Sequence, residues 1–291
     1  MEILDAHCHF WMPARGDYGW LDAAGPDLAS LRRDFLPDEL AAQSPAEVIA
    51  VQAAPTEAET QFLLSLAAQY PWIRGVVGWV DLADPAAAGR LAAMAANPRL
   101  VGLRPMLQDL PTDDWLLRHP HPATLSAMKA LGLRFDALVQ PRHLEPLARF
   151  TAQHPDLPIV IDHAAKPHLA TGRDSGWAEG MARLAGHRNV SCKLSGLLTE
   201  LAPEALAQPE TALAVLRPLF ARLLDWFGPA RLIWGSDWPV LTLAASYGAW
   251  RALTEALLDG LSADEKRAIL GGNARRFYGL DGGLDGGQEG A

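Results

Sequence analysis

The chain alternates between short apolar runs and longer segments in which apolar positions recur at helical spacing. Eight of the short runs, several of them almost continuously apolar, predict parallel β-strands that are covered on both faces. These runs are Ile3–His7, Val48–Gln52, Ile73–Val80, Leu100–Arg104, Leu133–Val139, Pro158–His163, Asn189–Leu194 and Arg231–Gly235. Because helical segments separate the runs, the pattern indicates an α/β protein.

Helices are predicted between the strands and after the last one. Their ranges are Glu57–Gln69, Pro85–Ala96, Pro122–Ala130, Leu144–Gln153, Trp177–Ala185, Glu210–Trp226, Tyr247–Leu258 and Ala263–Leu270, with Asn273–Leu280 expected to close the fold. Eight strands in strict alternation with helices favour a (β/α)8 TIM barrel. The main alternative is a doubly wound open sheet, which usually carries a glycine-rich phosphate turn after its first strand. This chain has HCHFWMP there instead.

The length of 291 residues suits one barrel with excursions. We predict a single catalytic domain over residues 1–280 and a disordered, glycine-rich tail over residues 281–291. The first connection, Trp11–Leu36, is long and rich in Gly, Asp, Pro and aromatic residues. We expect it either to cover the substrate or to pack as an ordinary excursion.

Composition narrows the range of partners. Apolar residues make up 49% of the chain, enough for a large core, and the net charge of −9 disfavours nucleic acid. Two cysteines far apart in the sequence, Cys8 and Cys192, do not make a disulfide framework. The sequence shows no signal-peptide pattern, and no apolar run approaches the roughly 20 residues of a membrane span. We therefore expect a cytoplasmic protein that binds neither nucleic acid nor membranes, with homo-oligomer formation left open.

Candidate catalytic residues follow from the rule that such barrels carry their chemistry at the carboxyl ends of the strands. The first strand ends in Asp5-Ala6-His7-Cys8-His9. Strand alternation is expected to place Asp5, His7 and His9 on one side, with Ala6 and Cys8 on the other. Two imidazoles at this spacing can converge on one metal ion or one substrate atom, so His7 and His9 are candidates.

Two more candidates lie at the ends of the eighth and sixth strands. Asp237 follows the eighth strand, which lies next to the first strand in a closed barrel, and a carboxylate there can accept a proton from water. The alternative, a helix N-cap, is disfavoured because Trp238-Pro239 follows directly. His163 ends the sixth strand and can act as an acid or polarise a carbonyl.

Four further charged residues are candidates for substrate binding. Arg104, at the end of the fourth strand, can clamp a carboxylate or an oxyanion, or form a salt bridge at the rim. Lys166, just after His163, can bind an anionic group. Asp136, in the fifth strand, can bind substrate hydroxyls, ligate a metal or form an ion pair, because a charge in an apolar strand needs a partner. Lys193, in the seventh strand, can bind substrate as a functional amine or pair with Asp136 or another barrel carboxylate.

Several motifs together resemble the amidohydrolase superfamily, in its amidohydrolase-2 branch. They are DAHCHFW, RGDYGWL, GLRP, IDHAAKP, CKLSG, WGSDWP and NARRFY, in this order from residue 5 to residue 278. Each motif alone is weak, but the ordered set at barrel-strand spacing is specific to the superfamily. Within the branch, the chain is similar to sugar-acid lactonases of the L-fuconolactonase and L-rhamnonolactonase type and to 2-pyrone-4,6-dicarboxylate lactonase.

The resemblance implies a hydrolase that opens the lactone ring of a sugar acid. In that family scheme, the residue matching Asp237 activates water, and those matching His7, His9 and His163 surround and polarise the carbonyl. The residue matching Arg104 binds substrate. Pyrone-dicarboxylate is a dianion that needs several arginines, so a polyhydroxylated aldonolactone suits this chain better.

The residues on the fourth and fifth strands bear on metal dependence. Metal-dependent members of the superfamily usually place a Lys or Glu on the fourth strand and a His on the fifth, where this chain has Arg104 and Asp136. We therefore expect that no cofactor is required, with a single divalent ion such as zinc on His7, His9 and Asp237 as the alternative. The alternative function is a metal-dependent amide hydrolase or decarboxylase on the same barrel.

Overall fold

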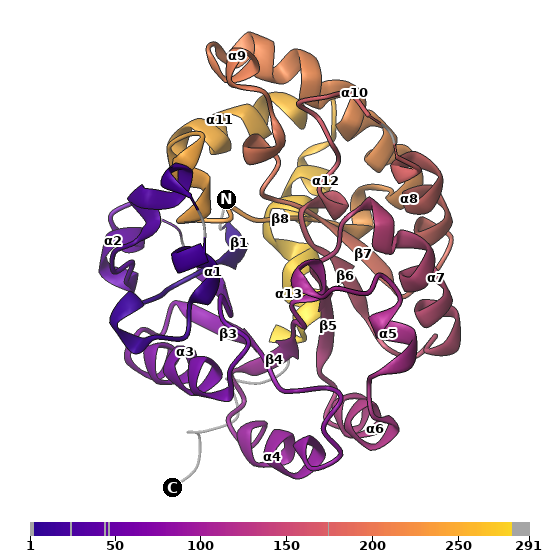
Figure 1. Cartoon of the computed structure of the whole chain (residues 1–291). Coiled ribbons are helices and arrows are strands. Elements are labelled where there is room, and N and C mark those ends of the chain that lie inside the picture. The colour runs from indigo at the N-terminus through magenta and orange to yellow at the C-terminus, as the bar shows by residue number, and fades with distance from the viewer. Residues whose placement is uncertain (1–2, 24, 44, 46, 174, 281–291) are drawn as a thin grey trace, which may run out of the picture.

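The computed structural model describes residues 3–23, 25–43, 45, 47–173 and 175–280. The tail predicted over residues 281–291 lies outside the described residues. Eight strands form one sheet in sequential order, and each neighbouring pair is parallel. Helices surround the strands (Figure 1). The last strand returns to the first, where a parallel bridge joins Cys8 to Trp238. The predicted (β/α)8 barrel is confirmed.

The elements have the following bounds. The strands are β1 (Leu4–Cys8), β2 (Glu47–Val51), β3 (Ile73–Gly78), β4 (Leu100–Leu103), β5 (Arg134–Ala137), β6 (Ile159–Ile161), β7 (Val190–Leu194) and β8 (Leu232–Trp234). The helices are α1 (Gly19–Ala23), α2 (Pro37–Ala41), α3 (Glu57–Gln69), α4 (Ala87–Met94), α5 (Trp115–Arg118), α6 (Pro122–Ala130), α7 (Leu144–Gln153), α8 (Trp177–Ala185), α9 (Pro203–Leu206), α10 (Pro209–Phe227), α11 (Tyr247–Leu257), α12 (Ala263–Arg267) and α13 (Asn273–Tyr278). Among the described residues, no helix combines the length and apolarity needed to cross a membrane.

The sequence predicts the bounds of α3, α6, α7 and α8 correctly, but it extends most strands too far. The largest difference that affects the site is at β6, which ends at Ile161 rather than at His163. The backbone leaves the strand there because residues 163–166 all adopt positive φ. The helix predicted over Ala263–Leu270 ends at Arg267 and continues as a π-helical turn over Ala268–Gly272.

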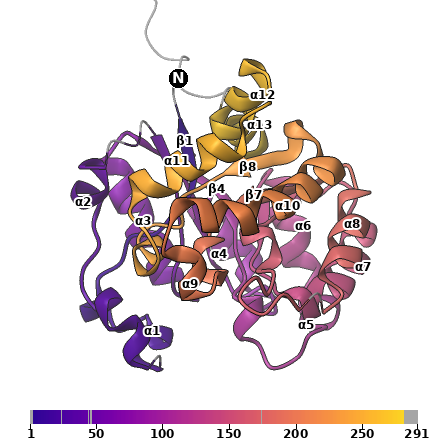
Figure 2. The same cartoon turned by 90° about the horizontal axis from the view of Figure 1, so that it is seen from above.

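The apolar core has two parts, a small cluster inside the barrel and a larger cluster around it. Strand residues such as Leu4, Ile49 and Val160 form the inner cluster, and Tyr278 of α13 belongs to it as well. The outer cluster lies between the strands and the surrounding helices. Helices α12 and α13 lie at the end of the barrel where the chain begins, and α1 and α5 lie at the opposite end (Figure 2). The carboxyl ends of the strands are therefore the open end of the barrel.

The first connection packs tightly and also contributes to the wall of a cavity. Trp11 and Phe35 exchange two backbone hydrogen bonds of 3.0 and 2.9 Å, which close a loop that contains α1. Trp11, Tyr18 and Phe35 are buried. Trp11 and Trp20 line the catalytic cavity described below. The segment is thus a packed excursion, and that it covers the substrate stays a prediction.

A buried carboxyl group anchors this loop to α3. The Tyr18 hydroxyl donates to Glu59 Oε2 at 2.6 Å, and Glu59 Oε1 accepts from the backbone N–H of Ala53 at 3.2 Å. Burial raises the pKa of Glu59 from 4.5 to about 7, against the opposing effect of the Tyr18 and Ala53 hydrogen bonds. The folded protein therefore holds the Glu59 proton more tightly than the unfolded chain does.

This pKa predicts how stability depends on pH. Since ionising Glu59 costs more in the folded state, Glu59 should contribute a loss of stability on the order of 3 kcal/mol as pH rises from about 4.5 to about 7. Glu59→Gln should remove that loss, which urea unfolding at about pH 5 and pH 8 would show. The exposed Glu204→Gln is the matched control and should behave as wild type. Parallel pH profiles for wild type and Glu59→Gln would contradict the assignment.

Candidate active site

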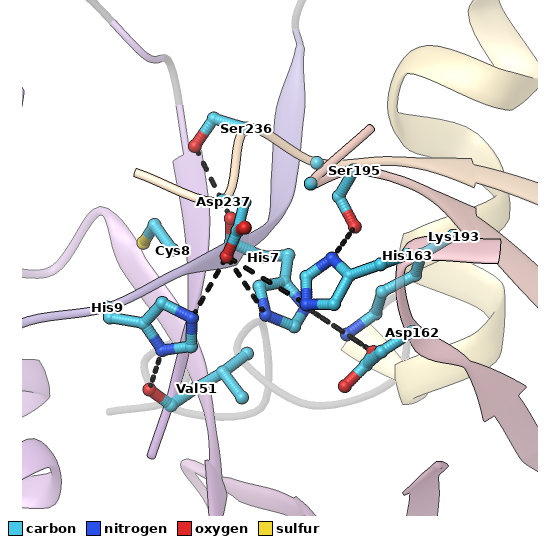
Figure 3. A network of polar contacts seen from close by, with 12 residues as sticks. His7, Cys8, His9, Val51, Asp162, His163, Lys193, Ser195, Ser236 and Asp237 are labelled. Atoms are coloured by element: carbon cyan, nitrogen blue, oxygen red, sulfur yellow. Dashed lines mark hydrogen bonds and ion pairs between the residues drawn. The ribbon is translucent and has the colours of Figure 1, made fainter. Parts of the chain in front are cut away.

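Four of the predicted catalytic side chains meet at the carboxyl end of the barrel (Figure 3). Asp237 Oδ1 lies 3.2 Å from His9 Nε2, 3.8 Å from His7 Nε2 and 3.9 Å from His163 Nε2. The His7 ring contacts those of His9 and His163, with centroids 4.9 and 4.5 Å apart. All four side chains are buried. Three imidazole nitrogens therefore surround one carboxylate oxygen.

The predicted strand alternation is correct for His7 and His9 but wrong for Asp5 and Ala6. The pairing register of β1 shifts between Asp5 and Cys8. An irregularity of this kind changes the face on which the side chains lie. Ala6 belongs to the inner apolar cluster, whereas Asp5 accepts hydrogen bonds from the N–H groups of Ser236 and His7, at 2.8 and 3.1 Å. Cys8 is buried in the outer layer, as expected.

Asp237 is held by the closure of the barrel. Its backbone N–H donates to the carbonyl of His7 at 2.7 Å, and the N–H of His9 donates to the carbonyl of Trp238 at the same distance. Its φ of 62° is in the left-handed region, which a non-glycine residue adopts only when the surroundings impose it. Asp237 caps no helix, because the following 3-10 turn begins without a side-chain cap.

His163 is placed by a left-handed turn. His163, Ala164, Ala165 and Lys166 all have φ between 48° and 60°, and the indole N–H of Trp177 donates to the Ala164 carbonyl at 2.7 Å. Left-handed backbone costs roughly 1–2 kcal/mol per residue. Such strain persists mostly at functional sites, where the surrounding structure imposes it. The turn brings His163 into the site and Lys166 to its edge.

A glycine permits this close approach. A Cβ atom at Gly196 would lie 2.5 Å from His163 Nδ1 and 2.9 Å from Asp237 Oδ2. Gly196 also has a positive φ of 60°. Both the space and the backbone therefore require glycine between the two catalytic groups.

The other ring nitrogen of each histidine has its own partner. His9 Nδ1 lies 2.8 Å from the Val51 carbonyl, and His163 Nδ1 lies 3.0 Å from Ser195 Oγ. His7 Nδ1 lies 3.0 Å from Lys193 Nζ. Contacts of this type fix ring orientation and turn the Nε2 atoms toward a shared centre. Ser195 was not a candidate in the sequence, where nothing distinguishes it from other serines.

The charges in the site are set by burial and by the neighbours. Burial raises the pKa of Asp237, but His163, His9 and His7 outweigh it, and the net pKa is well below the usual range. Burial lowers the pKa of His163 to about 4, and it also lowers the pKa values of His7 and His9. At neutral pH the centre is therefore an ionised carboxylate among neutral imidazoles.

A buried ionic network lies beneath these residues. Lys193 Nζ contacts Asp136 Oδ2 at 2.5 Å and Asp162 Oδ1 at 3.0 Å, and the Tyr278 hydroxyl donates to Asp136 Oδ2 at 2.7 Å. Asp136, Asp162 and Lys193 have no exposed surface. Asp136 thus forms an ion pair with Lys193, which is one of the alternatives that the sequence leaves open. Neither side chain is among those that line the catalytic cavity.

Asp162 is the main residue that the sequence interpretation missed. It lies 3.4 Å from His7 Nδ1 and 3.6 Å from the Arg104 guanidinium, and so links the network to the site. Burial raises its pKa, but Lys193 and His7 outweigh that effect and hold the pKa well below its usual range. The available signal was a carboxylate directly after the apolar run PIVI, next to His163.

The cavity at the centre is small, about 130 Å³. Five of the predicted site residues line it: His9, Arg104, His163, Lys166 and Asp237. The remaining wall is mostly apolar and includes two tryptophans: Trp11, Trp20, Ala53, Met106, Gln108, Asp109, Leu138 and Val240. Two of the lining residues, Arg104 and Lys166, are cations that can bind an oxyanion.

The residues present also fit a divalent metal ion. His7, His9 and Asp237 offer ligand atoms within 4.8 Å of one another, as do His7, Asp162 and His163. If His9 Nδ1 carries a proton donated to the Val51 carbonyl, its Nε2 presents a lone pair to Asp237 Oδ1 at 3.2 Å. Two acceptors at that distance need a proton or a cation between them.

A (β/α)8 barrel with this histidine and aspartate centre is the architecture of an amidohydrolase-type hydrolase. The sequence matches the model of the amidohydrolase family over residues 4–280. The chain belongs to this family.

Two curated relatives have the same described activity. The chain is 44% identical over 286 residues to an L-fucono-1,5-lactonase of Burkholderia ambifaria, with 96% of each chain covered. It is 39% identical over 288 residues to an L-fucono-1,5-lactonase of Burkholderia multivorans, covering 95% of this chain and 96% of the relative. A crystal structure of a Burkholderia multivorans amidohydrolase with bound zinc superposes with a TM-score of 0.87 at 37% identity, covering 96% of this chain and all of the other.

Proposed function

We propose that the protein hydrolyses the lactone ring of a sugar acid, with a 1,5-lactone of the L-fucono type as the first candidate. The observation that carries the proposal is the 44% identity, over 96% of both chains, to an L-fucono-1,5-lactonase. The site suits that chemistry, because it combines a buried carboxylate with two cationic side chains, the buried Arg104 and the partly buried Lys166. The alternative of an amide hydrolase or decarboxylase has less support, since both curated relatives are lactonases.

Each residue has a role in this proposal. Asp237 accepts a proton from a water molecule, whose oxygen attacks the lactone carbonyl carbon. His163 and Arg104 stabilise the negative charge that develops on the carbonyl oxygen. The ring C–O bond then breaks, and the proton held by Asp237 passes to the departing ring oxygen, which becomes a hydroxyl. Lys166 pairs with the carboxylate of the product.

A divalent metal ion would be held by His7, His9 and Asp237. When bound, such an ion would polarise the carbonyl and lower the pKa of water. We propose that hydrolysis does not require it, because Asp237 already supplies an ionised base and His163 and Arg104 supply hydrogen-bond donors. The cytoplasmic location and the formation of a homo-oligomer remain predictions from the sequence.

The proposal is tested by a panel of 1,4- and 1,5-aldonolactones in a pH-indicator assay, corrected for uncatalysed hydrolysis. We expect release of one proton per turnover, with L-fucono-1,5-lactone or a stereochemically close lactone giving the highest kcat/KM. Absence of enzyme-dependent acid release from every lactone in the panel would refute the proposal.

Chelation provides a separate prediction. After dialysis against a chelator and elemental analysis for zinc, the protein should keep most of its lactonase activity. The control is the same sample with zinc restored, which should change the rate little. Loss of activity on chelation with recovery on adding zinc would favour the metal-dependent alternative instead.

A further inference from the structure

A second cavity, of about 930 Å³, lies directly beside the catalytic one. The two share Trp20, Met106 and Asp109 as a common wall. We call the second one the outer cavity. It lies between the first connection and the loops that follow β3 and β4, at the end of the barrel where α1 and α5 lie (Figure 2). Nothing in the proposed reaction uses it.

The sizes of the two cavities suit a ligand that would extend from one into the other. Pockets that enclose a small organic ligand usually measure roughly 300–1,000 Å³. At about 130 Å³, the catalytic cavity holds the lactone carbonyl and its surroundings but not a large substituent. The volume of the outer cavity lies within the usual range. A longer substrate would project into it past the residues that line both cavities.

Aromatic side chains form much of the outer wall. Trp20, Trp79 and Trp115 are partly buried and line the cavity. The Trp20 indole N–H donates to the Ala53 carbonyl at 2.8 Å, and Trp115 stacks on His119 with ring centroids 5.6 Å apart. The hydrogen bond holds the Trp20 ring in place. Indole faces pack well against the C–H faces of pyranose rings, as they do against other flat apolar surfaces.

Carboxylates supply the polar groups of the outer cavity. Asp17, Asp81 and Asp109 line it, and no ion pair of Asp81 or Asp109 occurs within the part of the chain that the structure describes. Carboxylate oxygens accept hydrogen bonds from hydroxyl groups and repel anions. The outer cavity thus favours a neutral, hydroxyl-rich group, in contrast to the Arg104 and Lys166 side of the catalytic cavity.

We propose that the outer cavity is a binding site for an uncharged sugar ring attached to the lactone. The protein would then hydrolyse lactones of glycosylated sugar acids, such as those of disaccharide aldonic acids. This inference rests on the proposed lactonase function, because the reacting carbonyl must lie beside Asp237 while the second ring occupies the outer cavity.

The test compares the best monosaccharide lactone of the panel with its O-glucosyl derivatives, one for each free hydroxyl group. At least one derivative should have a kcat/KM equal to or above that of the parent lactone. Trp115→Ala should lower the ratio of kcat/KM for that derivative to kcat/KM for the parent about tenfold. The control is Trp226→Ala, a partly buried tryptophan on α10, which should leave the ratio unchanged.

The outcomes separate this inference from the function on which it rests. Hydrolysis of the parent lactone, with every glucosyl derivative more than about a hundredfold slower, would overturn the inference and leave the lactonase function standing. No hydrolysis of any lactone would overturn both. An unchanged ratio in a folded Trp115→Ala variant would also overturn the inference.

Charge gives a second, independent measurement. The favoured glucosyl derivative should be hydrolysed faster than its glucuronyl counterpart, which carries a carboxylate in place of the hydroxymethyl group. Asp81→Asn should narrow that difference, because Asp81 lines the outer cavity and lies outside the catalytic one. Equal rates for the two derivatives in wild type would overturn the proposed selection for an uncharged ring.

Discussion

Asp237→Asn should lower kcat for lactone hydrolysis at least about a thousandfold and leave the fold intact. The amide cannot accept the proton of the attacking water. It also removes the negative charge that lies within 3.9 Å of three imidazole nitrogens. The backbone contact that positions this residue, from its N–H to the His7 carbonyl, does not depend on the side chain.

Steady-state kinetics on the best lactone would measure the loss, and thermal unfolding would check the fold. Asp225→Asn, an exposed aspartate on α10, is the matched control and should turn over substrate like wild type. Near-wild-type turnover by a folded Asp237→Asn variant would show that another group is the base.

Lys193→Met should have the largest effect on stability, a loss of about 3–5 kcal/mol. The lysine is fully buried between Asp136 and Asp162, and it is their shared cation. Burial lowers its pKa, but the two carboxylates outweigh that effect and raise the pKa above the usual range. Removing the ammonium takes away the cation that Asp136 and Asp162 share, and leaves Arg104, 3.6 Å from Asp162, as the neighbouring charge.

The pH dependence of this variant distinguishes lost charge from lost packing. Without Lys193, both carboxyl groups should have raised folded-state pKa values, so the loss of stability should be smaller at about pH 5 than at pH 8. Adding Asp136→Asn should recover part of the loss at pH 8. Lys129→Met, at a surface ion pair, is the control and should change unfolding in urea by less than about 0.5 kcal/mol. A pH-independent loss that Asp136→Asn does not reduce would contradict the ionic explanation.

The barrel and the four side chains that meet at its carboxyl end could be predicted because both follow from local patterns. Strand periodicity and the position of polar residues at strand ends are enough to select His7, His9, His163 and Asp237 as candidates. The irregularity in β1 could not be predicted, because the exchange of faces by Asp5 and Ala6 depends on pairing with β2. A sequence shows which residues can bend a strand, but it does not show where the register shifts.

The roles of Lys193 and Trp115 show a second limit. Lys193 was equally compatible with substrate binding and with an ion pair, because the choice depends on which carboxylates reach it across the barrel. Trp115 lies on a short helix that the hydrophobic pattern does not reveal. Its place in the outer cavity depends on the neighbouring loops after β1 and β3. Contacts between residues far apart in the sequence are set by tertiary packing rather than by local sequence.

The bond between the Asp237 N–H and the His7 carbonyl joins parts of the chain separated by 230 positions in the sequence. During synthesis on the ribosome, the histidines of β1 emerge early and the aspartate emerges close to the end. The nascent chain therefore lacks the candidate base until most of it has been translated, and the site is assembled only when the last strand has docked. A chain truncated before β8 would carry every histidine of the site but not Asp237.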